Sequence, residues 1–409
     1  MKEWKEYRLG DIAQVKGGKR LPKGVNLIKE KNSHPYIRVR DLGQKKVLEL
    51  DSSYEYVDDK TQKSISRYIV NSGDIIISIV GTIGLVAIIG KTLDKANLTE
   101  NCVKLININA FNKDFLYYYL VSELGKNEIE KGIVGAVQAK LPIKNIQAIT
   151  IKAPNLERQS NIAKILKSLD DKIEINRRIN ENLEQQAQAL FKSWFVNFEP
   201  FKDGEFVESE LGMIPKGWRV VSLGDLMCYN GGSQPPASEF IEVYKEGYIR
   251  FIQIRDYASD GHITYIPISK RNKLCDVKDI MIARYGASLG RICFGLKGAY
   301  NVALAKVTPL KDYFREYLRC FLNTREFYEG INNKGNRAVQ AGFNQSDIQS
   351  FRLPFPTDDD IIMVFEKLCS SYFERRLLND QESRRLAELR DTLLPKLMSG
   401  ELKVNEPMN

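Results

Sequence analysis

The chain has 409 residues, 43% of them hydrophobic and 28% charged, and it carries a formal net charge of +9. This composition is typical of a soluble globular protein, and the length indicates two or three domains. Six cysteines lie far apart without a C-x-x-C pair, which argues against a metal cluster or disulfide scaffold and fits a reducing cytoplasm, while the charged N-terminus argues against a signal peptide.

The longest apolar run, IIISIVGTIGLVAIIG at residues 75–90, is the segment to consider as a membrane span. It is too short to cross a bilayer comfortably, and it contains three glycines. Two buried strands joined at Gly81–Gly84 explain it better, so we expect no membrane partner.

The sequence repeats itself just past its middle. WKEYRLGDIAQVKGGKRLP at residues 4–22 recurs as WRVVSLGDLMCYNGGSQPP at residues 218–236. Four further blocks recur in the same order: YIRVRDL and RFIQIRDY, GDIIISIVGTIG and KDIMIARYGASLG, GAVQA and RAVQA, NIQAITIKAP and DIQSFRLPFP. The offset drifts from 214 to 202 residues, which indicates small insertions in the loops of one duplicated fold.

Each copy begins with a globular part, in which short apolar or alternating runs are interrupted by Gly, Pro and Asn. Runs such as residues 75–80, 85–89 and 248–254 are predicted as strands. With a few helices between them they make an α+β domain. We place the first globular domain at residues 1–155 and the second, with its linker, at residues 197–357.

A long helix is predicted after each globular domain. The first covers residues 156–196, after Pro154 and with Asn155 as its N-cap, and the second covers residues 358–400. Pro395 is expected to kink or end the second helix. A heptad seam runs along each helix, through Ile162, Leu166, Leu169, Ile173, Asn176, Asn180, Leu183, Ala187, Leu190 and Trp194 in the first and Tyr372, Asn379, Leu386, Leu389, Leu393 and Leu397 in the second.

Neither helix can bury its seam alone, so we expect the two to pair as an antiparallel coiled coil. In a tandem repeat with a globular domain before each helix, this pairing places the domains at opposite ends. Asn176 and Asn379 occupy matching seam positions. They fix the register of the pair if they are buried, and the alternative is that they are exposed at the edge of the seam.

Positive charge is concentrated in the globular domains. Residues 1–155 carry a net charge of +8 and residues 215–357 carry +7, whereas segments 156–214 and 358–409 carry −3 each. Two basic domains joined by a slightly acidic middle favour a protein that binds nucleic acid with both domains, and we expect double-stranded DNA.

Basic residues and glutamines in the recurring loops are the candidate DNA contacts, because such side chains hydrogen-bond phosphates and base edges. For any single lysine a solvated surface position is the default, and for Gln138 and Gln340 the alternative is that they satisfy a turn. The candidates are Lys19, Arg20, Lys23, Arg38, Arg40 and Gln138 in the first domain, and Gln234, Arg250, Gln253, Arg255, Arg284, Arg291 and Gln340 in the second.

Catalytic motifs are absent from the sequence. Its two histidines, His34 and His262, have no second metal ligand nearby in sequence, and KGGKR lacks the spacing of a P-loop. No glycine-rich turn for a methyl donor and no N-P-P-[YF]-like segment is present. Two triplets, Asp58–Lys60 and Glu401–Lys403, match part of a nuclease cluster, but such triplets occur by chance in a charged chain. We therefore expect no catalytic residues and no metal ligands.

Several stretches together resemble the specificity subunit of type I restriction-modification systems, and the resemblance covers nearly the whole chain. They are IKNIQAITIKAPNLERQSNIAKIL, LDDKIEINRRINENLEQQAQALFKSWFVNFEP, GMIPKGWRVVSLGDL and LRDTLLPKLMSGEL. The resemblance implies that each globular domain is a target recognition domain that reads one half of a split, asymmetric DNA site. It implies that the helices set the gap between the half-sites and dock two methyltransferase subunits.

The resemblance also implies that this chain needs no cofactor. The methyltransferase subunits would bind S-adenosylmethionine and methylate adenine N6, and restriction-translocase subunits would join them, with ATP and Mg bound by these partners. Three alternatives stay open. The chain could serve a related type II system in which one partner chain both cuts and methylates, it could act on DNA alone as an enzyme, or it could be a coiled-coil adaptor without a DNA role.

Overall fold

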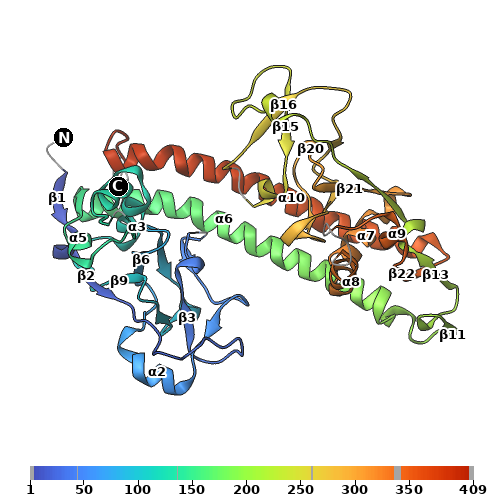
Figure 1. Cartoon of the computed structure of the whole chain (residues 1–409), viewed down its shortest axis with the longest axis horizontal. Helices are drawn as coiled ribbons and strands as arrows, with labels where there is room; N and C mark the ends of the chain where they lie inside the picture. Colours follow the sequence, from blue (N-terminus) through green and yellow to red (C-terminus); the bar gives the residue numbers. More distant parts are fainter. Residues whose placement is uncertain (1–3, 44, 136, 259–260, 336–341, 405–409) are drawn as a thin grey trace, which may run out of the picture. The chain divides into compact units, whose positions relative to one another are not determined.

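The computed structural model describes residues 4–43, 45–135, 137–258, 261–335 and 342–404, and Figure 1 shows the chain coloured along its sequence. The chain divides into two compact units. The first is formed by Met1–Ile175 with Glu382–Asn409, and the second by Asn176–Gln381. Each unit contains one globular domain and a part of both long helices.

The two long helices predicted from the heptad pattern are present, green and red in Figure 1. α6 spans Leu156–Phe191 and is followed by a π-helical turn at Lys192–Val196. Asn155 is its N-cap as predicted, since the Asn155 Oδ1 accepts the Arg158 N–H at 2.9 Å. α10 spans Asp359–Ser399.

Pro395 was expected to kink or end the second helix. It does not end the helix, because α10 continues through Pro395 to Ser399, and the kink stays a prediction. Proline removes one backbone hydrogen bond at this point. Leu397 and Met398 in the last turn are only 0% and 1% exposed within the core of the first unit, and this burial keeps the turn helical. The helix stops at Gly400, whose φ of +76° suits a helix C-terminus.

α6 and α10 pair in the antiparallel direction. In the first unit Arg390 Nη1 lies 2.8 Å from Asp170 Oδ1, and Lys172 Nζ lies 3.4 Å from Glu382 Oε2. The residue numbers rise along α6 while those of the partners fall along α10, which defines the antiparallel arrangement that the seam predicted.

The seam asparagines are buried in the second unit, with Asn176 0% and Asn379 2% exposed. Asn379 Nδ2 donates to Asn180 Oδ1 at 2.8 Å, and Asn180 Nδ2 donates to Asp380 Oδ1 at 2.7 Å. The alternative in which the asparagines are exposed at the seam edge is therefore wrong. A hydrogen-bonded polar group inside an apolar seam favours one register, because any slip would leave it unsatisfied.

One seam residue was misassigned from the sequence. Leu389 is 47% exposed. The next residue, Arg390, faces α6 instead and pairs with Asp170. The seam therefore steps by four after Leu386 rather than by three, because the charge on α6 selects the arginine for the inner face.

In the first unit, the two ends of the globular domain meet in one antiparallel pair, β1 with β10. The other strands form a five-stranded sheet in the order β2-β9-β6-β7-β4 and a three-stranded sheet in the order β5-β3-β8. The bounds are β1 Lys5–Arg8, β2 Gln14–Gly17, β3 Pro35–Ile37, β4 Val47–Leu48, β5 Glu55–Tyr56, β6 Ile75–Ser78, β7 Val86–Ile89, β8 Asn97–Leu98, β9 Cys102–Ile106, β10 Thr150–Ala153, α1 Leu9–Ile12, α2 Asp59–Ile65, α3 Lys113–Val121, α4 Glu123–Lys131 and α5 Ile143–Gln147.

The second unit repeats this plan. β13 pairs with β22, and the two sheets have the orders β14-β21-β18-β19 and β16-β15-β20-β17. A hairpin of β11 and β12 precedes them. The bounds are β11 Phe206–Ser209, β12 Gly212–Pro215, β13 Trp218–Ser222, β14 Met227–Gly231, β15 Tyr248–Ile252, β16 Thr264–Pro267, β17 Leu274–Cys275, β18 Ile280–Ala283, β19 Ile292–Cys293, β20 Gly298–Tyr300, β21 Leu304–Pro309, β22 Arg352–Pro356, α7 Arg315–Leu322, α8 Arg325–Gly335 and α9 Gln345–Gln349.

The structure confirms the α+β fold class and the duplication. The parallel register Ile37↔Leu98 of β3 and β8 recurs as Ile252↔Tyr300 in β15 and β20. The apolar run predicted as two strands forms β6 and β7, which pair antiparallel and are largely buried. Among the described residues, no helix combines the length and apolar character needed to cross a membrane.

Candidate nucleic-acid interface

A glycine pair shapes the first candidate loop in each globular domain. A Cβ on Gly18 would lie 2.0 Å from the carbonyl oxygen of Thr99, and a Cβ on Gly232 would lie 2.0 Å from that of Asn301. Only glycine lets two backbones approach this closely. The loop that follows each pair is therefore anchored at equivalent places, beside the residue after β8 or β20.

Lys19, Arg20 and Lys23 lie on this loop in the first domain, and all three are exposed. Arg20 Nε is 2.6 Å from Glu100 Oε1, yet the Arg20 side chain stays 81% exposed. An ion pair this exposed adds little stability, so Arg20 can exchange the carboxylate for a phosphate at low cost. In the second domain Gln234, also exposed, takes the position of Arg20.

The second candidate loop follows β3, and its two arginines share one carboxylate. Arg38 is half-buried and pairs with Glu55, while Arg40 Nη2 lies 3.2 Å from Glu55 Oε2 with its side chain 58% exposed. Asp41 Oδ2 accepts the Arg38 N–H at 2.7 Å and so closes the turn. Burial raises the pKa of Asp41 to about 6, and the charge of Arg40 opposes that rise.

The same turn follows β15 in the second domain with different side chains. Asp256 Oδ2 accepts the Gln253 N–H at 2.8 Å, so Gln253 stands where the first domain has Arg38. Arg255 Nε lies 4.0 Å from Asp256 Oδ1, with its side chain 53% exposed. Arg250 lies within β15 and is half-buried. The turns after β3 and β15 thus share one backbone geometry but carry different polar side chains.

Gln138 lies on a third loop, which two backbone hydrogen bonds close. Val134 and Lys140 exchange N–H···O bonds of 2.9 Å, and Lys140 also bridges to Val80, beyond the end of β6. Gln138 itself is exposed. The equivalent bridge in the second domain joins Tyr285 to Gly342. Gln340, the remaining glutamine candidate, lies outside the described residues.

Arg284 differs from the other candidates because two tyrosine rings lie near its guanidinium. The Arg284 Cζ lies 5.0 Å from the ring centre of Tyr285 and 5.9 Å from that of Tyr229. Such packing holds a planar guanidinium in a fixed orientation. Tyr285 is 40% exposed beside it. The sequence motif RYGASLGR contained this tyrosine, and its position next to Arg284 was the signal that could have identified it.

Arg291 is exposed and lines an open cavity of about 570 Å³. Arg325 and Tyr328, from the first turn of α8, line the same cavity. Neither residue was a candidate from the sequence, because they lie 34 and 37 residues after Arg291 and no local motif marks them. The cavity adds a cationic and an aromatic group beside Arg291.

A family model described as the type I restriction modification DNA specificity domain matches the chain twice, over residues 1–185 and 215–370. The two matches follow the duplication and include most of the chain. The chain belongs to this family.

Curated relatives carry the same description. The type I restriction enzyme MjaIX specificity subunit of Methanocaldococcus jannaschii is 29% identical over 423 residues, which covers 99% of this chain and 95% of the relative. The type I restriction enzyme HindI specificity subunit of Haemophilus influenzae is 26% identical, covering 98% and 100%. A type I restriction-modification S subunit from M. genitalium has a similar fold, with a TM-score of 0.53, 16% identity and 96% of each chain covered.

Membership in this family bears on the alternatives that the sequence left open. A type I specificity subunit is a DNA-recognition subunit without catalytic activity, and its two matched segments correspond to two target recognition domains. An adaptor without a DNA role does not fit this description. A related type II system is not favoured, because the relatives are named type I subunits.

Proposed function

We propose that the chain reads a split, asymmetric DNA site, with one half-site recognised by each globular domain. One observation carries the proposal: the two domains share a backbone frame and differ in the polar side chains on it. Arg38 of the first domain is replaced by Gln253 at the equivalent position of the second. Arginine prefers guanine and glutamine prefers adenine in the major groove, so the half-sites should differ.

The thirteen candidate residues are our proposed DNA contacts, and their environments suggest different roles. Exposed residues on the glycine-anchored loops, such as Arg20 and Lys23, suit phosphates, since a flexible cation can follow the backbone. Arg284, with its guanidinium near two tyrosine rings, suits a base edge, because bidentate hydrogen bonds need a fixed guanidinium plane.

The helix pair, in this proposal, sets the gap between the half-sites and docks two methyltransferase subunits that methylate adenine N6. The antiparallel register and the buried asparagines support a spacer of fixed length. S-adenosylmethionine, ATP and Mg would be bound by the methyltransferase and restriction-translocase partners in the cytoplasm, where the DNA lies.

A genome-wide map of N6-methyladenine in the host, with and without this gene, tests the proposal. If a bipartite motif loses methylation in the deletion strain and regains it on complementation, the proposal holds and both half-sites are identified. If the partners are expressed and active with another specificity subunit, yet this chain directs no methylation, the proposal is wrong.

A further inference from the structure

A cluster of five polar side chains, here called the tyrosine cluster, joins the first globular domain to both long helices. Its members are Lys46, Asp114, Tyr118, Asp170 and Arg390. Lys46 Nζ lies 2.7 Å from Asp114 Oδ1 and donates to the Tyr118 hydroxyl at 3.0 Å. The Tyr118 hydroxyl donates to Asp170 Oδ2 at 2.5 Å, and Arg390 Nη1 donates to Asp170 Oδ1 at 2.8 Å.

The tyrosine cluster is partly shielded from water and connects four parts of the chain. The Lys46 side chain is 9% exposed and that of Asp170 is 12% exposed. Burial, followed by the charge of Asp170, raises the pKa of Tyr118, so its hydroxyl keeps the proton that it donates. The loop before β4, α3, α6 and α10 each contribute a member, and one hydroxyl links the domain to α6.

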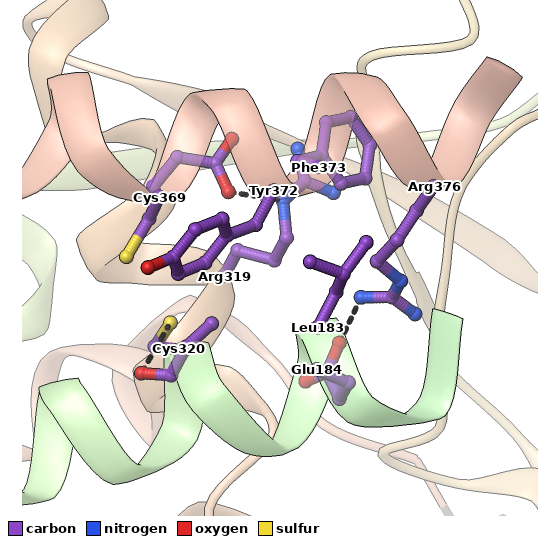
Figure 2. A pocket seen from close by; sticks show the side chains of 10 residues that line it. Leu183, Glu184, Arg319, Cys320, Cys369, Tyr372, Phe373 and Arg376 are labelled. Carbon is purple, nitrogen blue, oxygen red and sulfur yellow. Dashed lines mark hydrogen bonds and ion pairs between the residues drawn. The ribbon is translucent and has the colours of Figure 1, made fainter. Parts of the chain in front are cut away.

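A different cluster, here called the arginine cluster, links the globular domain to the long helices in the second unit. Its members are Phe294, Glu316, Arg319, Phe373 and Arg376. Arg319 Cζ lies 3.4 Å from the ring centre of Phe373, and Arg319 Nε lies 2.9 Å from Glu316 Oε2. Figure 2 shows Arg319 against Phe373 of α10, and Arg376 directed at Glu184 of α6.

The two clusters occupy equivalent positions and differ in chemistry. At the offset of 202 residues, Asp114 corresponds to Glu316 and Tyr118 to Cys320. At the offset of 203 that relates the helices, Asp170 corresponds to Phe373. A hydrogen bond to a carboxylate in one unit is thus replaced by a guanidinium stacked on a ring in the other. Each globular domain therefore contacts the long helices through side chains that differ from those in the other unit.

We propose that these two clusters hold each recognition domain at a fixed angle on the helices. They thereby restrict the length of the gap between half-sites that the complex accepts. This inference rests on the proposed function. Hydrogen bonds and stacked ion pairs are directional, whereas the apolar contacts around them tolerate small rotations. Loosening a cluster should therefore relax the permitted gap without changing the bases that are read.

The test uses the full chain in complex with the methyltransferase subunit from the same host. Methyl transfer is measured on duplexes carrying both half-sites at the native gap and at one base pair more or less. Tyr118→Phe removes only the hydroxyl that joins α3 to α6, and we expect the rate at the altered gaps, relative to the native gap, to rise by about fivefold, the factor expected for one lost hydrogen bond.

Tyr119→Phe is the matched control, because its hydroxyl donates to Thr150 O at 3.2 Å, inside the same domain. It should keep the wild-type gap preference. If Tyr118→Phe behaves as Tyr119→Phe does, the inference is overturned. If Tyr118→Phe does not fold, Asp170→Asn decides in the same assay. A wild-type complex that methylates no bipartite site would instead refute the proposed function.

Discussion

For Arg284, a DNA contact proposed from the sequence, the structure adds the surroundings of the guanidinium and so allows a specific prediction. Its guanidinium lies near the rings of Tyr229 and Tyr285, and its backbone N–H donates to Ala303 O at 2.8 Å. If this plane faces a guanine, Arg284→Ala should reduce methylation and relax one position of the second half-site, at a cost of about 1–3 kcal/mol.

Competition binding with duplexes substituted at each position of the second half-site measures this effect. Arg352→Ala in β22 removes the same charge from the domain and serves as the control. Uniform weakening by Arg284→Ala across all sequences would assign Arg284 to a phosphate and contradict the base contact.

Glu366 gives the second unit a dependence on pH. Its Oε2 accepts the Glu316 N–H at 2.7 Å and so joins α10 to the first turn of α7. Burial, with the charge of Glu316, raises the pKa of Glu366 from 4.5 to about 7. Between these values the folded form keeps a proton that the unfolded chain releases, so this contribution to stability is complete below pH 4.5 and is lost as the pH rises to 7.

Glu366→Gln cannot titrate, so it should flatten the fall in thermal midpoint between pH 4.5 and 7. Scanning calorimetry at several pH values checks this. Glu374→Gln is the comparison, because Glu374 is exposed and its ion pair with Lys278 lowers its pKa. It should leave the fall in place, and a fall that persists in Glu366→Gln would contradict the assignment.

At the scale of elements, the glycine pair of the first domain contains one glycine that the backbone requires and one that can be replaced. A Cβ on Gly18 would meet backbone oxygens at 2.0 and 2.4 Å, whereas a Cβ on Gly17 would meet only Ile143 Cδ1, at 3.6 Å. Gly18→Ala should therefore destabilise the first unit by about 1–3 kcal/mol through displacement of the loop, and Gly17→Ala by less than about 0.5 kcal/mol. Thermal unfolding of the two variants decides, and equal midpoints would show that the loop adapts freely.

For the whole molecule, the sequence predicted features that depend on local or repeated signals. The duplication, the α+β class and the start of α6 at its Asn155 cap all rest on letters close together or repeated in order. The error at Leu389 and the continuation of α10 past Pro395 arose where a distant partner decides the outcome, Asp170 in one case and the core around Leu397 in the other.

The candidate site was predictable in part for the same reason. Which loops recur could be read from the sequence, but the partners of Arg38 and Arg284 could not, since pairing with Glu55 or packing on Tyr229 depends on strand order. The domain boundaries at residues 155, 196 and 357 stay predictions, as do the individual DNA contacts.

The length of the helix pair provides the test that involves both recognition domains at once. Residues 174–180 of α6 and 377–383 of α10 form a matched heptad pair that contains Asn176, Asn180 and Asn379. Deleting both segments removes the buried asparagine network as a unit and shortens the pair by about 10 Å, at 1.5 Å per residue. Because seven residues are close to two helical turns, the remaining seam keeps its phase.

If the helices set the gap, this double deletion should shorten it by about three base pairs, at 3.4 Å of rise per step. Both half-site sequences should stay the same, since neither segment contains a proposed DNA contact. The methylation rate should fall, because three base pairs turn DNA by about 100° while a heptad turns the helix pair by only about 20°. Methylome sequencing of a strain carrying the deletion measures gap and half-sites together. An unchanged gap, or altered half-sites, would show that distance and sequence are not read by separate parts of the molecule.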